Sequence, residues 1–104
     1  MAWFYLFMAG IMEIIWSYCM KESAGFTRIL PTVICITTMV ASVVLLALAM
    51  KNLPLGTAYT IWTGIGAVGA FLVGLLVLGE PASSLRLFAA LLIVTGLVLM
   101  KWAS

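Results

Sequence analysis

The chain has 104 residues, of which 66% are hydrophobic and 8% are charged, and its mean hydropathy is +1.32. Soluble domains are less apolar and carry about a quarter charged residues, so this composition excludes an ordinary soluble domain and indicates an integral membrane protein. The net charge of +2 is ordinary for membrane-flanking loops and indicates no nucleic-acid partner.

Four apolar stretches are each long enough to cross a bilayer as a helix, at about residues 2–20, 29–50, 56–78 and 85–102. We therefore predict an all-α membrane protein with a single transmembrane domain, residues 1–104, of four helices. The connections are short and could not house a lid or a catalytic domain. The first stretch is interpreted as a retained helix, because no Lys or Arg precedes Lys21 and no signal-peptide cleavage pattern follows its apolar part.

Glu13 is a lone carboxylate inside the first stretch. A helix would place it roughly 15–18 Å from the start, near the middle of a hydrocarbon layer about 30 Å thick. An ionised acid at that depth needs a cation, a hydrated cavity or a proton, so it predicts a functional site. Trp16 and Gly10 share its helix face, each three residues away. Trp16 offers an N–H donor and a ring face that attracts cations, and the alternative is that it only packs at an interface.

The second stretch carries Ser42, whose hydroxyl could bond a carboxylate, although such hydroxyls more often bond a carbonyl of their own helix. In the third stretch, Tyr59 and Trp62 lie three residues apart on one face. Gly64 and Gly66 reduce helix stiffness at mid-depth, which predicts a hinge. The alternative is that these glycines serve helix packing alone.

The fourth stretch has no charge at mid-depth. Ala89 and Gly96 lie two turns apart on a surface suited to self-association, so we expect them to pack in a dimer. Lys101 and Trp102 are typical of anchors at the membrane interface.

Basic groups are balanced between the two membrane faces. Lys21, Arg28 and Arg86 fall on one side, and Lys51, Lys101 and the terminal amine on the other. The positive-inside rule therefore selects no orientation, and copies inserted oppositely could pair. Four helices can hardly enclose a hydrated pocket that opens to both sides, and larger transporters use two inverted repeats for this purpose. We therefore expect an antiparallel, dual-topology homodimer.

Cys19 and Cys35 both lie inside apolar stretches without C-x-x-C spacing, and we expect them to be reduced thiols that pack. The sequence has no His, which excludes a classical His-containing metal site, and no metal is expected. It also has no phosphate loop or nucleophile motif. We therefore expect no cofactor and no enzymatic activity.

The four stretches, Glu13 and two runs in the third stretch together resemble the small multidrug resistance family over the whole chain; the runs are Gly56-Thr57-Ala58-Tyr59 and Trp62-Thr63-Gly64-Ile65-Gly66. Trp16 after the acid and Lys101 at the end of the last helix are similar to the guanidinium exporter subtype. The chain departs from the family at Thr60, where Ala normally follows the Tyr. This departure bears on substrate range more than on fold.

The resemblance implies an antiparallel homodimer in a bacterial inner membrane, in which protons entering drive guanidinium out. It implies one site shared by both copies of Glu13 and lined by Trp16, Ser42, Tyr59 and Trp62. We expect Gly10, Thr60 and Thr63 to support this site.

Two acids in one poorly solvated pocket disfavour each other's ionisation, so we expect them to retain protons near neutral pH. A guanidinium ion is planar and rich in N–H donors, and it can bridge carboxylates as an Arg side chain does. Proton and substrate would then compete for the same acids, and a rocking of the two protomers would exchange the side to which the site opens.

Two other functions are open. An exporter of quaternary ammonium drugs would handle cations without N–H donors, which suit an aromatic cage better than oriented carboxylates. A non-transporting membrane adaptor would use Glu13 only to join helices by hydrogen bonds.

Overall fold

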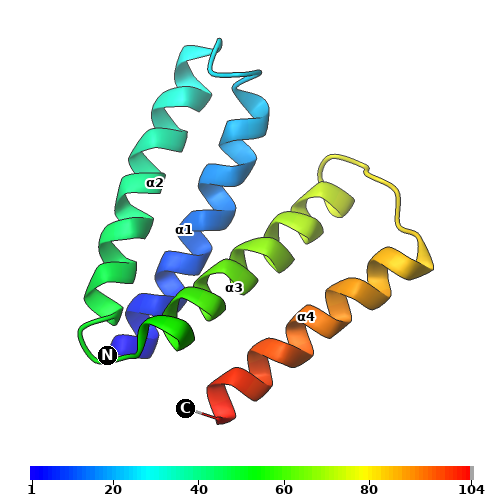
Figure 1. Cartoon of the computed structure of the whole chain (residues 1–104). Helices are drawn as coiled ribbons and strands as arrows, with labels where there is room; N and C mark the ends of the chain where they lie inside the picture. Colours follow the sequence, from blue (N-terminus) through cyan, green and yellow to red (C-terminus); the bar gives the residue numbers. More distant parts are fainter. Residues whose placement is uncertain (104) are drawn as a thin grey trace.

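Four α-helices make up the chain in a computed structural model that describes residues 1–103 (Figure 1). They are α1 (Ala2–Glu22), α2 (Ile29–Ala49), α3 (Leu55–Leu76) and α4 (Ser84–Trp102). Each is long and apolar enough to cross a membrane, and the prediction of four such helices is confirmed. The helices begin and end within a residue or two of the limits expected from the apolar stretches.

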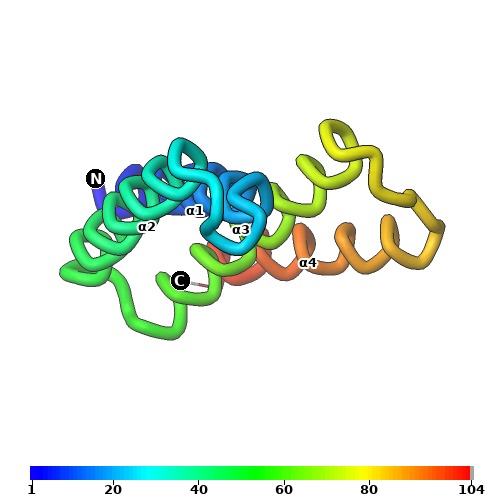
Figure 2. The backbone as a smooth tube through the Cα atoms, turned by 90° about the horizontal axis from the view of Figure 1, so that it is seen from above, coloured from blue at the N-terminus to red at the C-terminus, as the bar shows by residue number. Residues whose placement is uncertain are grey.

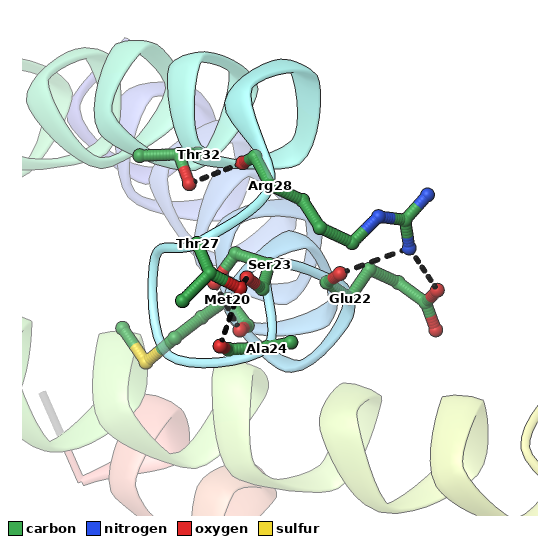
Figure 3. Close-up of polar contacts among 7 residues, drawn as sticks. All are labelled: Met20, Glu22, Ser23, Ala24, Thr27, Arg28 and Thr32. Carbon is green, nitrogen blue, oxygen red and sulfur yellow. Dashed lines mark hydrogen bonds and ion pairs between the residues drawn. The ribbon is translucent and has the colours of Figure 1, made fainter.

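The turn between α1 and α2 is built around Ser23. Three consecutive residues, Ala24, Gly25 and Phe26, have positive φ angles of 51°, 76° and 66°. The left-handed region costs a residue with a Cβ roughly 1–2 kcal/mol, so this turn needs compensating bonds. The buried Ser23 hydroxyl donates to the Met20 carbonyl at 2.7 Å, shown in Figure 3, and accepts from the Phe26 N–H at 3.0 Å. These bonds hold the reversal of the chain tightly.

Proline and serine mark the starts of the later helices. Pro31 lies in the first turn of α2, where its missing N–H has no intrahelical partner to lose. Pro54 is the N-cap of α3, with an extended backbone. Ser83 caps α4 by accepting a hydrogen bond from the Arg86 backbone N–H at 3.2 Å. Each boundary is therefore set by a local residue type visible in the sequence.

The helices are unequally packed. α1 packs against both α2 and α3, whereas α4 packs along α3 (Figures 1 and 2). α1 also reaches α4 through the Lys101 Nζ, which lies 4.9 Å from the centroid of the Trp3 ring. The principal extents are 39 × 34 × 16 Å, so the chain is a slab little thicker than one helix with its side chains. Such a slab does not surround a central pocket by itself.

The apolar core lies where the start of α1, the end of α2 and the start of α3 meet. Its buried residues are Leu6, Ala9, Leu46, Ala49, Ala58 and Ile61. From there α3 leans away from α1 toward its C-terminal end (Figure 1). No residue of α4 is buried within the described chain. α1 and α3 are therefore closely packed near one membrane face and diverge toward the other.

Candidate functional site

Glu13 lies at mid-length of α1, with its side chain against α3. A Cβ placed on Gly66 would overlap the carboxyl group of Glu13, so the absence of a side chain at Gly66 makes the room that the acid occupies. The Glu13 Oε1 atom is buried, and no group within residues 1–103 hydrogen-bonds it. A buried acceptor without a partner costs about 1–3 kcal/mol, and more when it is charged. This acid is therefore placed to receive a donor.

Trp16 follows Glu13 by one helical turn and carries a buried hydrogen-bond donor. Its Nε1 atom is buried, and no acceptor in the described part of the chain is bonded to it. Most buried polar groups in folded proteins have a partner, and an exception asks for a functional explanation or a bound molecule. The Glu13 acceptor and the Trp16 donor therefore lie three residues apart, on one face of the helix.

Ser42 and Trp62 join three helices beside this acid. The Trp62 Nε1–H donates to the Ser42 Oγ at 2.9 Å, and the Ser42 hydroxyl donates to the Ala9 carbonyl at 2.7 Å. We call this chain of bonds, from α3 through α2 to α1, the relay. Ala9 is one turn before Glu13 on α1, so the relay fixes the helices around the acid and does not bond the acid itself. Tyr59 continues the aromatic side, with its ring centroid 5.4 Å from that of Trp62.

Breaking the relay is expected to destabilise the fold. Ser42→Ala would leave the Trp62 N–H without its acceptor inside the bundle, at a cost of about 1–3 kcal/mol. Thr38→Val is the matched control, because the Thr38 hydroxyl bonds only the Ile34 and Cys35 carbonyls of its own helix. Thermal unfolding in detergent should show a lower midpoint for Ser42→Ala than for Thr38→Val. Equal midpoints would mean that the relay carries no net stability.

The expected supporting residues divide between two faces of α3. The Gly10 position of α1 packs on Ile65, whose Cγ2 would lie 2.6 Å from an added Cβ. Thr60 and Thr63 instead line a mainly apolar cavity of about 570 Å³ between α3 and α4, together with Tyr59. The structure therefore brings Gly10 to the α1–α3 seam and places both threonines on the side facing α4.

The two glycines expected to form a hinge lie in an unbroken helix, because α3 is continuous from Leu55 to Leu76. Both make close approaches: a Cβ on Gly64 would overlap the Leu97 side chain of α4, and one on Gly66 would overlap Glu13. These contacts favour the packing interpretation, and the hinge stays a prediction.

The residues expected in a dimer are open within the chain. Gly96 has no neighbouring atom within 4 Å of an added Cβ, and it lines the large α3–α4 cavity. Ala89 lines a separate cavity of about 160 Å³ between the same helices. Neither is covered by another helix of the described chain.

Two features of this site were missed by sequence reasoning. One is the backbone carbonyl of Ala9 as an acceptor for Ser42, which no side-chain pattern could reveal. The other is the close packing of the Glu13 carboxyl group on Gly66. The run of glycines predicted a close contact, but not that Glu13 makes it. Among residues 1–103, no group of three His, Cys, Asp or Glu side chains is placed to hold a metal ion.

Four apolar helices, with an acid at mid-length of the first that has no hydrogen-bond partner within residues 1–103, indicate a small multi-pass membrane protein with a functional site inside its membrane-spanning part. Comparison with known families gives the same class. The family described as Small Multidrug Resistance protein matches residues 1–94, and the chain belongs to this family.

Relatives match over essentially the whole chain. A protein of Salmonella typhimurium named Guanidinium exporter is 52% identical over 101 residues, covering 97% of this chain and 96% of the relative. One of Escherichia coli (strain K12) with the same name is 50% identical with the same coverage. A third of that name, from Yersinia pseudotuberculosis, is 51% identical over 104 residues, covering 100% of both chains.

Proposed function

We propose that the chain exports guanidinium and small substituted guanidinium ions in exchange for protons, as an antiparallel homodimer in a bacterial inner membrane. The observation that carries this proposal is a buried Glu13 oxygen, one turn from the buried Trp16 N–H; neither group has a hydrogen-bond partner within residues 1–103. Relatives named Guanidinium exporter, at about half identity over nearly all of the chain, support the same substrate.

Guanidinium suits this site because it satisfies charge and hydrogen bonds together. Its N–H groups lie in a plane and can make two parallel bonds to a carboxylate, as the Arg side chain does. The ring face of Trp16 can attract the flat cation from the side. A proton on Glu13 removes the negative charge and one acceptor, so proton and guanidinium exclude each other at the acid. That competition couples the two fluxes when only loaded protomers change conformation.

The dimer supplies what one slab lacks. The chain is only 16 Å thick along its shortest axis, so a second copy would complete the walls around Glu13. α4, which buries none of its residues, offers a face for that copy through Ala89 and Gly96. In this arrangement the relay holds Trp62 near the acid. Tyr59 is half exposed, so its ring can contact the second copy of the chain.

Uptake of labelled guanidinium into proteoliposomes of the purified chain tests the proposal. With an acidic interior, outward protons should drive uptake well above the rate without a pH gradient, and reversing the gradient should suppress it. A tetraalkylammonium in excess should compete weakly, because it has no N–H group for Glu13. Uptake that ignores the pH gradient would rule out proton coupling, and no uptake by the purified chain would rule out the exporter.

A further inference from the structure

A cavity with both polar and apolar walls lies on the α1–α3 seam, away from Glu13. Its volume is about 170 Å³, many times the ~10–15 Å³ that one water requires. We call it the vestibule; its polar lining residues are Ser17, Tyr18, Lys21 and Glu80, and the rest of its lining, Gly74 included, is small or apolar. Its lining residues belong to the C-terminal halves of α1 and α3 and to the segment that leads into α4. Figure 1 shows that these two helix halves diverge.

The vestibule lies on the same helix faces as the central acid. On α1, Glu13, Ser17 and Lys21 follow at intervals of four residues and share one face. Gly66 and Gly74 of α3 likewise share a face, one meeting Glu13 and the other lining the vestibule. At about 1.5 Å per helical residue, the vestibule begins at Ser17, about 6 Å along α1 from the central acid, and extends to Lys21, about 12 Å from it.

Glu80 points back into this cavity. Its backbone N–H donates to the Gly74 carbonyl at 2.9 Å, and its carboxyl lies where a Cβ on Gly74 would be. The Glu80 Oε1 is 3.8 Å from the Arg86 Nη2, and both side chains are about two-fifths exposed. An exposed pair at that distance contributes roughly 0–1 kcal/mol, so the carboxylate exchanges partners easily.

Arg86 keeps other partners when Glu80 releases it. It donates to the Pro81 carbonyl, and its guanidinium lies 5.1 Å from the centroid of the Phe71 ring. The group that Glu80 already binds is therefore a guanidinium, the same chemical group as the proposed substrate, and that group is held independently of Glu80.

The other walls complete a cation site. The Ser17 hydroxyl donates to the Ile14 carbonyl at 2.8 Å, which leaves its lone pairs to accept from an N–H. Tyr18 also lines the cavity, and its aromatic ring is a group that attracts flat cations. Lys21 lines the same space, and its positive charge opposes a second cation nearby. A site with one attracting and one opposing charge releases its ligand quickly.

We propose that the vestibule is an outer binding site, in which a guanidinium ion takes the place of Arg86 on Glu80 before it passes along the seam to Glu13. This inference rests on the proposed function, because it assigns the entry route of that substrate. Neutralising Glu80 should then weaken capture without slowing the central step, and neutralising Lys21 should strengthen capture.

Transport kinetics at low ionic strength test the route. Glu80→Gln is expected to raise the KM for guanidinium roughly two- to fivefold at unchanged kcat, the range of an exposed charge pair. Lys21→Gln is expected to lower the KM. Glu22→Gln is the matched control. Glu22 lies at the same membrane face and pairs with Arg28 at 3.8 Å (Figure 3), and it is not among the residues that line the vestibule. An equal rise in Glu22→Gln would overturn the proposal in favour of general attraction by surface charge.

Binding in a Glu13→Gln background separates this inference from the proposed function. Guanidinium chloride should still shift the amide NMR signal of Gly74, and Glu80→Gln added to that background should remove the shift. No shift at Gly74 would overturn the vestibule even if the wild-type chain transports guanidinium. A wild-type chain without any guanidinium uptake would instead overturn the proposed function.

Discussion

Glu13→Gln is expected to reduce guanidinium transport at least about a hundredfold, because the amide cannot carry the charge that balances the cation and cannot exchange a proton. The side-chain volume is nearly unchanged, so the contact with Gly66 should persist. Initial rates of guanidinium uptake into proteoliposomes, with an acidic interior, measure the effect. Proton movement triggered by guanidinium should disappear together with uptake.

Two further variants make the result specific. Glu13→Asp keeps the charge on a shorter side chain and should retain partial transport with a weaker apparent affinity. Glu22→Gln removes an exposed acid that is paired with Arg28 at the end of α1, and should transport at a rate near that of the wild type. If Glu13→Gln transports as fast as Glu22→Gln, the central acid is not the shared binding group.

Gly66→Ala is expected to lower guanidinium affinity roughly tenfold or more and to destabilise the fold. The added Cβ would overlap the carboxyl group of Glu13, so the acid or α3 must move. Overpacking of this kind costs typically about 1–3 kcal/mol. Binding by titration calorimetry and unfolding in detergent measure the two effects on the same sample.

Gly56→Ala is the matched control on the same helix, since nothing lies within 4 Å of a Cβ added there. An alanine in place of a helical glycine favours the helix by about 1 kcal/mol, so this variant should be as stable as the wild type or more so. If Gly66→Ala binds guanidinium as tightly as Gly56→Ala does, the space at Gly66 has no bearing on the acid.

The four helices were predictable because a membrane span needs a long apolar run, and only short polar connections interrupt the runs of this chain. The order of packing was not predictable in the same way. Apolar residues surround every helix in lipid, so the sequence shows no single stripe that tells which helix α4 contacts. The structure gives α4 one main neighbour, α3.

Periodicity within one helix predicted part of the site. It placed Gly10 and Trp16 on the face of Glu13. In the described part of the chain, the Trp16 N–H and a Glu13 oxygen are both buried without hydrogen-bond partners. Periodicity could not predict contacts between helices, because it shows which residues share one face of a helix but not which other helix packs against that face. The hydroxyl of Ser42 thus finds the backbone of Ala9, which has no signature in the sequence. Glu80 stood in a connection without any repeat, and only the structure brings it to Gly74.

Because no residue of α4 is buried within the described chain, the exported flux depends on the number of copies in the membrane in a particular way. Lipid tails are as apolar as leucine, so a single chain loses little by remaining dispersed in the bilayer. If copies pair through this helix, crowding in the plane of the membrane decides how many are assembled. At low expression the exported flux would then grow with the square of the copy number, and a cell that halves its supply would lose about three-quarters of its export.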